Sequence, residues 1–153
     1  MNTDVLIRNW EMADSREKCA RFFNVQIKKL FMYLAKNIVD RECLLKVCEL
    51  KDKFNIACDT IYTYEQIVEK IGPVLQKWIE KIIKYDYEFF KQTNITILLT
   101  DACGKNISAA EKNINDETRV IFDRSLTQNM RIVIFDALNI LLRLYARYNI
   151  LTK

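Results

Sequence analysis

The sequence predicts an all-α fold: a single-domain bundle of six or seven helices packed around a largely buried C-terminal helix. The 153 residues include only two glycines and one proline, so few residues interrupt helix-forming sequence. Half of the residues are hydrophobic and 29% are charged, a balance typical of packed globular proteins and not of disordered chains. No repeat, low-complexity run or flexible linker divides the chain, and we expect one helical domain over residues 1–153.

Capping residues and apolar stripes locate the first two helices. The run Asp14-Ser15-Arg16-Glu17 is a capping-box-like helix start. The apolar face that follows it consists of Phe23, Ile27, Leu30, Leu34 and Ile38, with Arg21, Lys28, Lys29 and Lys36 on the opposite face. Asp40 is placed to cap a second helix, whose stripe is Cys43, Val47, Leu50, Phe54 and Cys58.

Another capping box lies in the middle of the chain. Thr63 and Gln66 open a short helix that we expect to stop at Gly72. Pro73 suits the first turn of the next helix, over residues 73–91, because its missing N–H would be unpaired there in any case.

Residues 93–104 permit two interpretations. Their β-branched residues fit a strand, whereas Asn94 as N-cap and Gly104 just beyond the end frame a short helix equally well. We favour the helix because a lone strand would lack a partner in a helical chain. Ser108 and Asp116 are placed to begin two further helices.

The segment 129–149 is the most apolar part of the chain. Its polar residues fall within about 160° of the helical wheel, which predicts a helix with a wide apolar face at the centre of the bundle. They are Arg131, Asp136, Asn139, Arg143 and Arg147. These residues also break every apolar run well short of the roughly 18 residues of a membrane span, so we expect none.

One acidic residue, Asp86, falls on an otherwise apolar helix face. Asp86 falls near the middle of the apolar face of the 73–91 helix, where a bare buried charge would be very costly. It should therefore be paired, protonated, or released by a helix break near residues 85–87. We predict a structural ion pair between Asp86 and either Arg143 or Arg147, on the narrow polar strip of the C-terminal helix.

The five cysteines are interpreted as free thiols. They are Cys19, Cys43, Cys48, Cys58 and Cys103. On a continuous helix, Cys43 and Cys48 would point about 140° apart, and Cys43 and Cys58 would lie about 22 Å apart, so neither pair could form a disulfide. The odd count and the absence of a signal-peptide pattern indicate a reducing, intracellular compartment, cytoplasmic or nuclear. No C-x-x-C run supports a zinc site.

Composition removes most catalytic chemistry. The chain has no histidine, so Ser-His and Cys-His pairs and imidazole metal ligands are excluded. Two glycines cannot form a phosphate-binding loop, and the carboxylates lack the paired spacing of a di-metal bundle. We therefore expect no enzyme, no cofactor and no catalytic or metal-binding residue.

Residues 62–79 resemble a helix-turn-helix. Val68 and Gly72 have the four-residue offset seen where two helices of that motif meet, and Trp78 stands where a core residue is expected. The resemblance implies a nucleic-acid-binding module that uses the 64–91 helix pair. The second helix carries acidic residues beside its lysines, however, and the net charge of +4 is spread thinly along the chain.

The expectation we place first is a non-enzymatic, intracellular protein-interaction protein, acting as a structural or regulatory subunit of a larger assembly. Its partner would be another protein or a second copy, and specific nucleic-acid binding is the alternative. The third expectation is a helical host-directed regulator of cell death or immunity. Viral bundles of that kind are similar in size and class, although Asn9-Trp10-Glu11 departs from their Asn-Trp-Gly-Arg signature. Richness in Asn, Ile and Lys is associated with AT-rich genomes, including those of large DNA viruses.

Overall fold

The computed structural model describes residues 5–92 and 125–151, and within these ranges the protein is an all-α bundle without strands. Its helices are α1 (Arg16–Asn37), α2 (Arg41–Ile56), α3 (Tyr64–Lys77), α4 (Ile79–Ile83), α5 (Tyr87–Gln92) and α8 (Gln128–Leu151). Short 3₁₀ and π-helical turns cover Trp10–Met12 and Ala57–Ile61. The predictions for residues 93–104 and for helices beginning at Ser108 and Asp116 lie outside the described residues.

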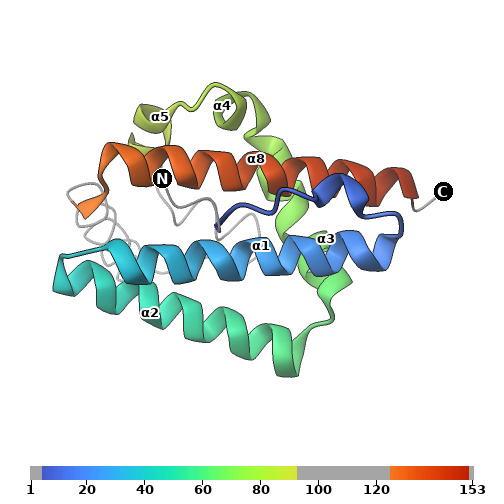
Figure 1. Ribbon diagram of the computed structural model, residues 1–153, viewed down its shortest axis with the longest axis horizontal. Helices are drawn as coiled ribbons and strands as arrows, with labels where there is room; N and C mark the ends of the chain where they lie inside the picture. Colours follow the sequence, from blue (N-terminus) through green and yellow to red (C-terminus); the bar gives the residue numbers. More distant parts are fainter. Residues whose placement is uncertain (1–4, 93–124, 152–153) are drawn as a thin grey trace.

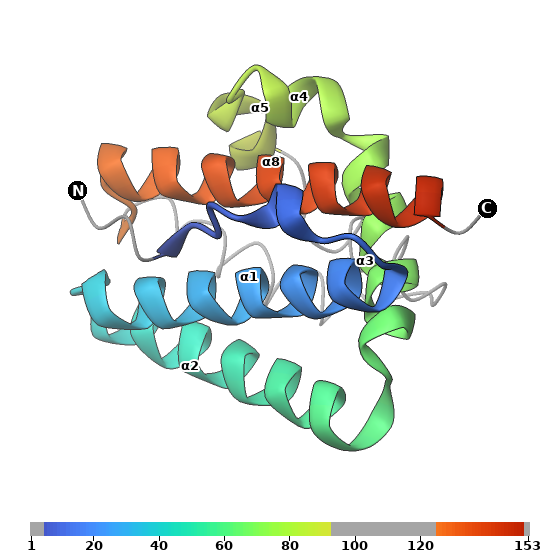
Figure 2. The ribbon, with the colours of Figure 1, turned by 45° about the vertical axis from the view of Figure 1, so that its right-hand side comes forward.

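Helices α1 and α8 share the centre of the bundle. They run side by side, with α2 on the far side of α1 and with α4 and α5 on the far side of α8 (Figures 1 and 2). Helix α1 contacts α2, α3 and α8, and α8 also contacts α3 and α4. The predicted C-terminal helix is present, but α1 is as central to the packing as α8 is.

Most residues of the predicted apolar stripes meet in two clusters of buried side chains, whereas Leu50 of the α2 stripe is exposed. One cluster joins α1, α3 and α8 and includes Phe23, Ile27, Val68, Leu141, Leu144 and Tyr148. The other joins α1, α2 and the start of α8 and includes Leu34, Ile38, Cys43, Val47, Met130 and Val133. Burying each of the larger side chains contributes about 1.5–3 kcal/mol.

The predicted caps Asp40 and Thr63 are confirmed, and the first helix is capped by Ser15, the residue after Asp14 in the predicted box. The Ser15 hydroxyl accepts a hydrogen bond from the Lys18 N–H at 3.1 Å, and the Asp40 carboxylate accepts one from the Cys43 N–H at 3.1 Å. The Thr63 and Gln66 box is reciprocal, with bonds of 3.1 and 2.8 Å. These side chains satisfy donors that the first turn of a helix leaves unpaired.

The predicted boundaries between residues 64 and 91 are wrong. Helix α3 does not stop at Gly72 but continues through Pro73 to Lys77. The expected 73–91 helix is divided at Trp78, and again at Tyr85, whose φ of 55° lies in the left-handed region. The second helix of the suggested helix-turn-helix therefore does not form as one element.

Candidate functional site

The N-terminal segment, residues 5–13, is an integral part of the fold. It lies between α1 and α8 in both views of the ribbon (Figures 1 and 2). Val5, Ile7 and Ala13 are buried, whereas Arg8 and Met12 between them are exposed. Only part of the segment is thus packed into the core, and the rest faces solvent.

Polar side chains from α1 and α8 hold the segment at two points. The buried Gln26 amide accepts a hydrogen bond from the Ile7 N–H and donates one to the Val5 carbonyl, both at 2.9 Å. At the other end, the Arg147 guanidinium donates two bonds to the Ala13 carbonyl, at 3.1 and 2.8 Å. The segment is therefore fixed by side chains and not by a sheet or a helix ladder.

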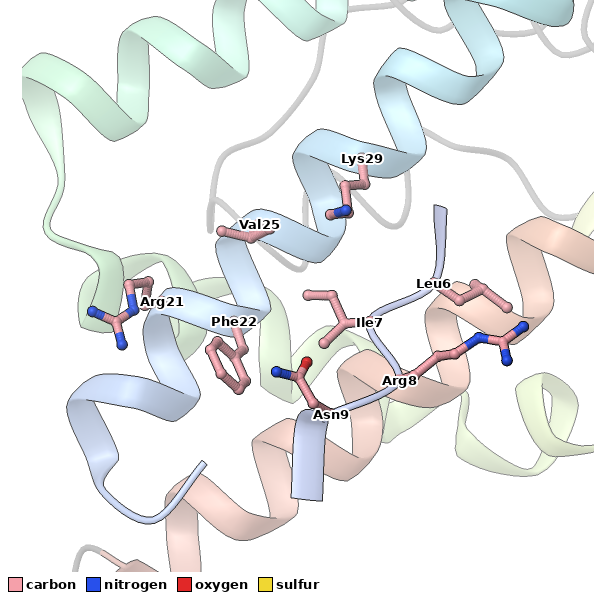
Figure 3. Close-up of a pocket in the computed structure, with 8 residues that line it drawn as sticks. All are labelled: Leu6, Ile7, Arg8, Asn9, Arg21, Phe22, Val25 and Lys29. Carbon is pink, nitrogen blue, oxygen red and sulfur yellow. The ribbon is translucent and has the colours of Figure 1, made fainter. Parts of the chain in front are cut away.

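A groove of about 680 Å³ runs between this segment and α1. Its lining residues are Leu6, Ile7, Arg8, Asn9, Arg21, Phe22, Val25 and Lys29, and we call it the basic groove. In Figure 3, Phe22 and Val25 of α1 lie beside Ile7 and Asn9 of the segment. Arg21 and Lys29 extend from α1, whereas Arg8 extends to the opposite side of the segment (Figure 3).

The basic groove carries charge of one sign. Three of its eight lining residues are cationic and none is acidic. Helix α1 continues this pattern, because residues 18–36 contain five cations and no acidic residue. Arg8 and Arg21 form no ion pair with any residue that the structure describes. The surface around the groove should therefore attract anionic groups.

A second cavity, of about 370 Å³, lies on the α8 side of the segment and has mixed charge. The Tyr85 hydroxyl donates a hydrogen bond to the Asp136 carboxylate there, and the Arg143 guanidinium lies 5.3 Å from the Trp10 ring centroid. Burial, followed by the Asp136 contacts, raises the pKa of Tyr85 to about 12. Arg8 lines this cavity as well as the basic groove.

The structure does not bring the three predicted ion-pair residues together. The Asp86 carboxylate lies 3.6 Å from the Lys81 ammonium and accepts the Phe89 N–H at 3.0 Å, so it caps α5. Arg143 stacks on Trp10 and Arg147 binds the Ala13 carbonyl. A helix break near residues 85–87 was the stated alternative to an ion pair. The structure has this break, so Asp86 leaves the apolar face and does not link its helix to α8.

The cysteines of the described residues are free. Cys19, Cys43 and Cys58 are buried and Cys48 is half-buried, while Cys103 lies outside the described residues. Burial raises the pKa of the Cys19, Cys43 and Cys58 thiols above the ordinary range. Within residues 5–92 and 125–151, no group of three potential metal ligands comes together.

Sequence reasoning missed the buried amides of α1. Gln26 and Asn24 are almost completely buried. The Asn24 side chain donates to the Ala20 and Tyr64 carbonyls and accepts a bond from the Cys58 thiol at 3.3 Å. The signal for Gln26 was available, because the helical wheel places it at the edge of the apolar face, about 40° from Leu30.

Comparisons with known proteins identify no relative of this chain. No protein-family model, no curated protein and no solved structure matches the chain. Among the described residues, no helix combines the length and the apolar character needed to cross a membrane.

Proposed function

We propose that this protein is a non-enzymatic interaction protein whose basic groove binds an acidic segment of a partner protein. The observation that carries the proposal is that the groove has an apolar floor and that its charged lining residues are all cationic. Phe22 and Val25 offer surface for apolar side chains, while Arg21 beside them, which forms no ion pair with any described residue, favours carboxylates. The partner segment would therefore alternate acidic and apolar residues.

A protein partner fits this groove better than a nucleic acid does. Three cations would neutralise few phosphates, and binding of that kind is weak and strongly salt-dependent. Phosphodiester chains also gain little from an apolar floor unless aromatic side chains stack on their bases. Phe22 is the one aromatic residue of the lining.

A different protein fits better than a second copy of this chain. Two copies that met through this surface would bring together like charges from residues 18–36 of each α1. We therefore propose a subunit or regulator of a heteromeric assembly. Its free thiols, Cys19, Cys43 and Cys58 among them, are compatible with the reducing interior of a cell.

Fluorescence polarisation with labelled peptides tests the proposal. The probe is a twelve-residue peptide that alternates Glu and Leu, and its control replaces every Glu with Gln. We expect the acidic peptide to bind at least about tenfold more tightly, a difference of about 1.4 kcal/mol, and to weaken as salt is raised. Equal binding of both peptides, or tighter binding of a single-stranded oligonucleotide, would contradict the proposal.

Charge reversal locates the binding surface. Arg21→Glu should abolish the preference for the acidic peptide. Arg41→Glu is the matched control: Arg41 is exposed, lies outside the groove at the start of α2, and undergoes the same change in charge. An equal loss in both variants would show that net charge, and not the groove, governs binding.

A further inference from the structure

The residue that shapes the basic groove does not line it. Gln26 lies on the buried side of α1, while the groove opens on the side that carries Arg21 and Val25. Its amide nevertheless bonds to the backbone on both sides of Leu6, through the Val5 carbonyl and the Ile7 N–H. The wall that faces α1 is formed by the chain that follows directly, at Ile7, Arg8 and Asn9.

We infer that Gln26 is a positioning residue for partner binding, and that binding and docking of the N-terminal segment stabilise each other. This inference rests on the proposed function. The segment supplies four of the eight lining residues, so the groove exists only while the segment is docked. A partner that contacts both walls binds the docked state alone, and it must stabilise that state.

The coupling between docking and binding depends most on the Val5–Ile7 end of the segment, where Gln26 bonds to the backbone. Between Val5 and Ala13 the chain is held to the helices by the buried side chains of Val5, Ile7 and Ala13 and by the contact of Trp10 with Arg143. Polar side chains hold it at its two ends, through the Gln26 amide at Val5 and Ile7 and the Arg147 guanidinium at Ala13. Removing the Gln26 amide would leave the Ile7 N–H and the Val5 carbonyl unpaired in a buried place, which disfavours docking. If the segment is then docked in only a fraction of the molecules, the apparent affinity for the partner is the intrinsic affinity multiplied by that fraction.

The first test compares two buried amides of the same helix. Gln26→Leu keeps side-chain volume but removes both bonds to the segment. Asn24→Leu removes a buried amide that contacts Ala20, Tyr64 and Cys58, none of which belongs to the segment. We expect Gln26→Leu to weaken binding of the acidic peptide at least about fivefold, and Asn24→Leu to change it less than about twofold.

The second test uses the unmodified protein, so it does not depend on how either variant folds. The Ile7 N–H donates to Gln26, and its hydrogen exchange therefore reports docking of the segment directly. Saturating acidic peptide should slow exchange at Ile7 at least about tenfold, while the Gln-containing peptide, which binds more weakly, should slow it less at the same concentration.

The outcomes separate this inference from the proposed function. Peptide binding to the wild type with unchanged Ile7 exchange and undiminished affinity in Gln26→Leu would overturn the inference and leave the proposed function standing. Failure of the acidic peptide to bind the wild type would overturn both. Slower Ile7 exchange together with a selective loss in Gln26→Leu would support both.

Discussion

Gly72 of α3 lies against the ring of Tyr145 of α8. A Cβ atom at residue 72 would stand 2.3 Å from Cδ1 of that ring and 2.8 Å from its Cγ, distances that no ordinary contact allows. The conflict involves the base of the ring, so rotating the end of the side chain cannot relieve it. This close approach explains why glycine is tolerated inside α3, where alanine would favour the helix by about 1 kcal/mol.

Gly72→Ala should consequently destabilise the protein, because the overlap with Tyr145 outweighs the gain in helix propensity. We expect a net loss of about 1–3 kcal/mol in the free energy of unfolding, measured by urea denaturation. In a Tyr145→Ala background the same substitution should be neutral or stabilising. A stabilising effect of Gly72→Ala alone would show that α3 and α8 are not packed in this way.

Asp86→Ala should cause a moderate loss, and not the severe one expected of a broken buried ion pair. Asp86 is about one-third exposed and acts mainly as the cap of α5, so we expect about 0.5–2 kcal/mol. Asp86→Asn preserves the capping acceptor and should cost less. Lys81→Ala should stay within the 0–1 kcal/mol that is usual for an exposed pair. A loss of about 3–5 kcal/mol in Asp86→Ala would restore the buried-pair interpretation.

Local signals in the sequence predicted the helix starts and much of the core. Asp40 and Thr63 cap the helices that they were expected to cap, because an N-cap bond joins residues three positions apart. Helix α1 also begins within the predicted box, but Ser15 caps it in place of Asp14. The apolar stripe of α1 is buried for the same local reason, the period of the helix.

The errors arise where tertiary contacts override local preference. Gly72 and Pro73 are ordinary helix-ending residues, yet α3 continues through them while Tyr145 occupies the space beside Gly72. Nothing in the sequence near Tyr85 predicts a positive φ, which places its hydroxyl against Asp136 of α8. The basic groove could not be predicted from the sequence for the same reason. Its second wall forms only through contacts between residues 5–9 and α1.

Native thiol labelling should distinguish Cys48 from the buried cysteines. Burial shields Cys19, Cys43 and Cys58, and by raising their pKa it lowers the fraction of reactive thiolate. In a Cys103→Ser background at pH 8, we expect one fast thiol, abolished by Cys48→Ser, and three slow ones. Full denaturation should expose all four at one rate. Rapid native labelling of Cys58 would contradict its burial beside Asn24.

Stability should fall as pH rises from about 10 toward 12, in part through Tyr85. Its pKa is raised from the ordinary 10 to about 12, so over this window the unfolded state loses the phenolic proton first. The contribution is therefore fully present below pH 10 and disappears as pH passes the folded-state value. Chemical denaturation at several pH values should show a shallower decline for Tyr85→Phe than for the wild type. Identical slopes would place the hydroxyl in solvent.

Mapping the binding surface by amide chemical shifts tests the central claim most directly. The labelled protein is titrated with the peptide that alternates Glu and Leu, at low and at physiological salt. We predict that the largest shift changes fall on residues 6–9 and 21–29, the two walls of the basic groove, and that Arg21→Glu removes them. Shifts centred instead on residues 79–89 or on α2, or none at saturating peptide, would contradict the claim that this groove is the docking site.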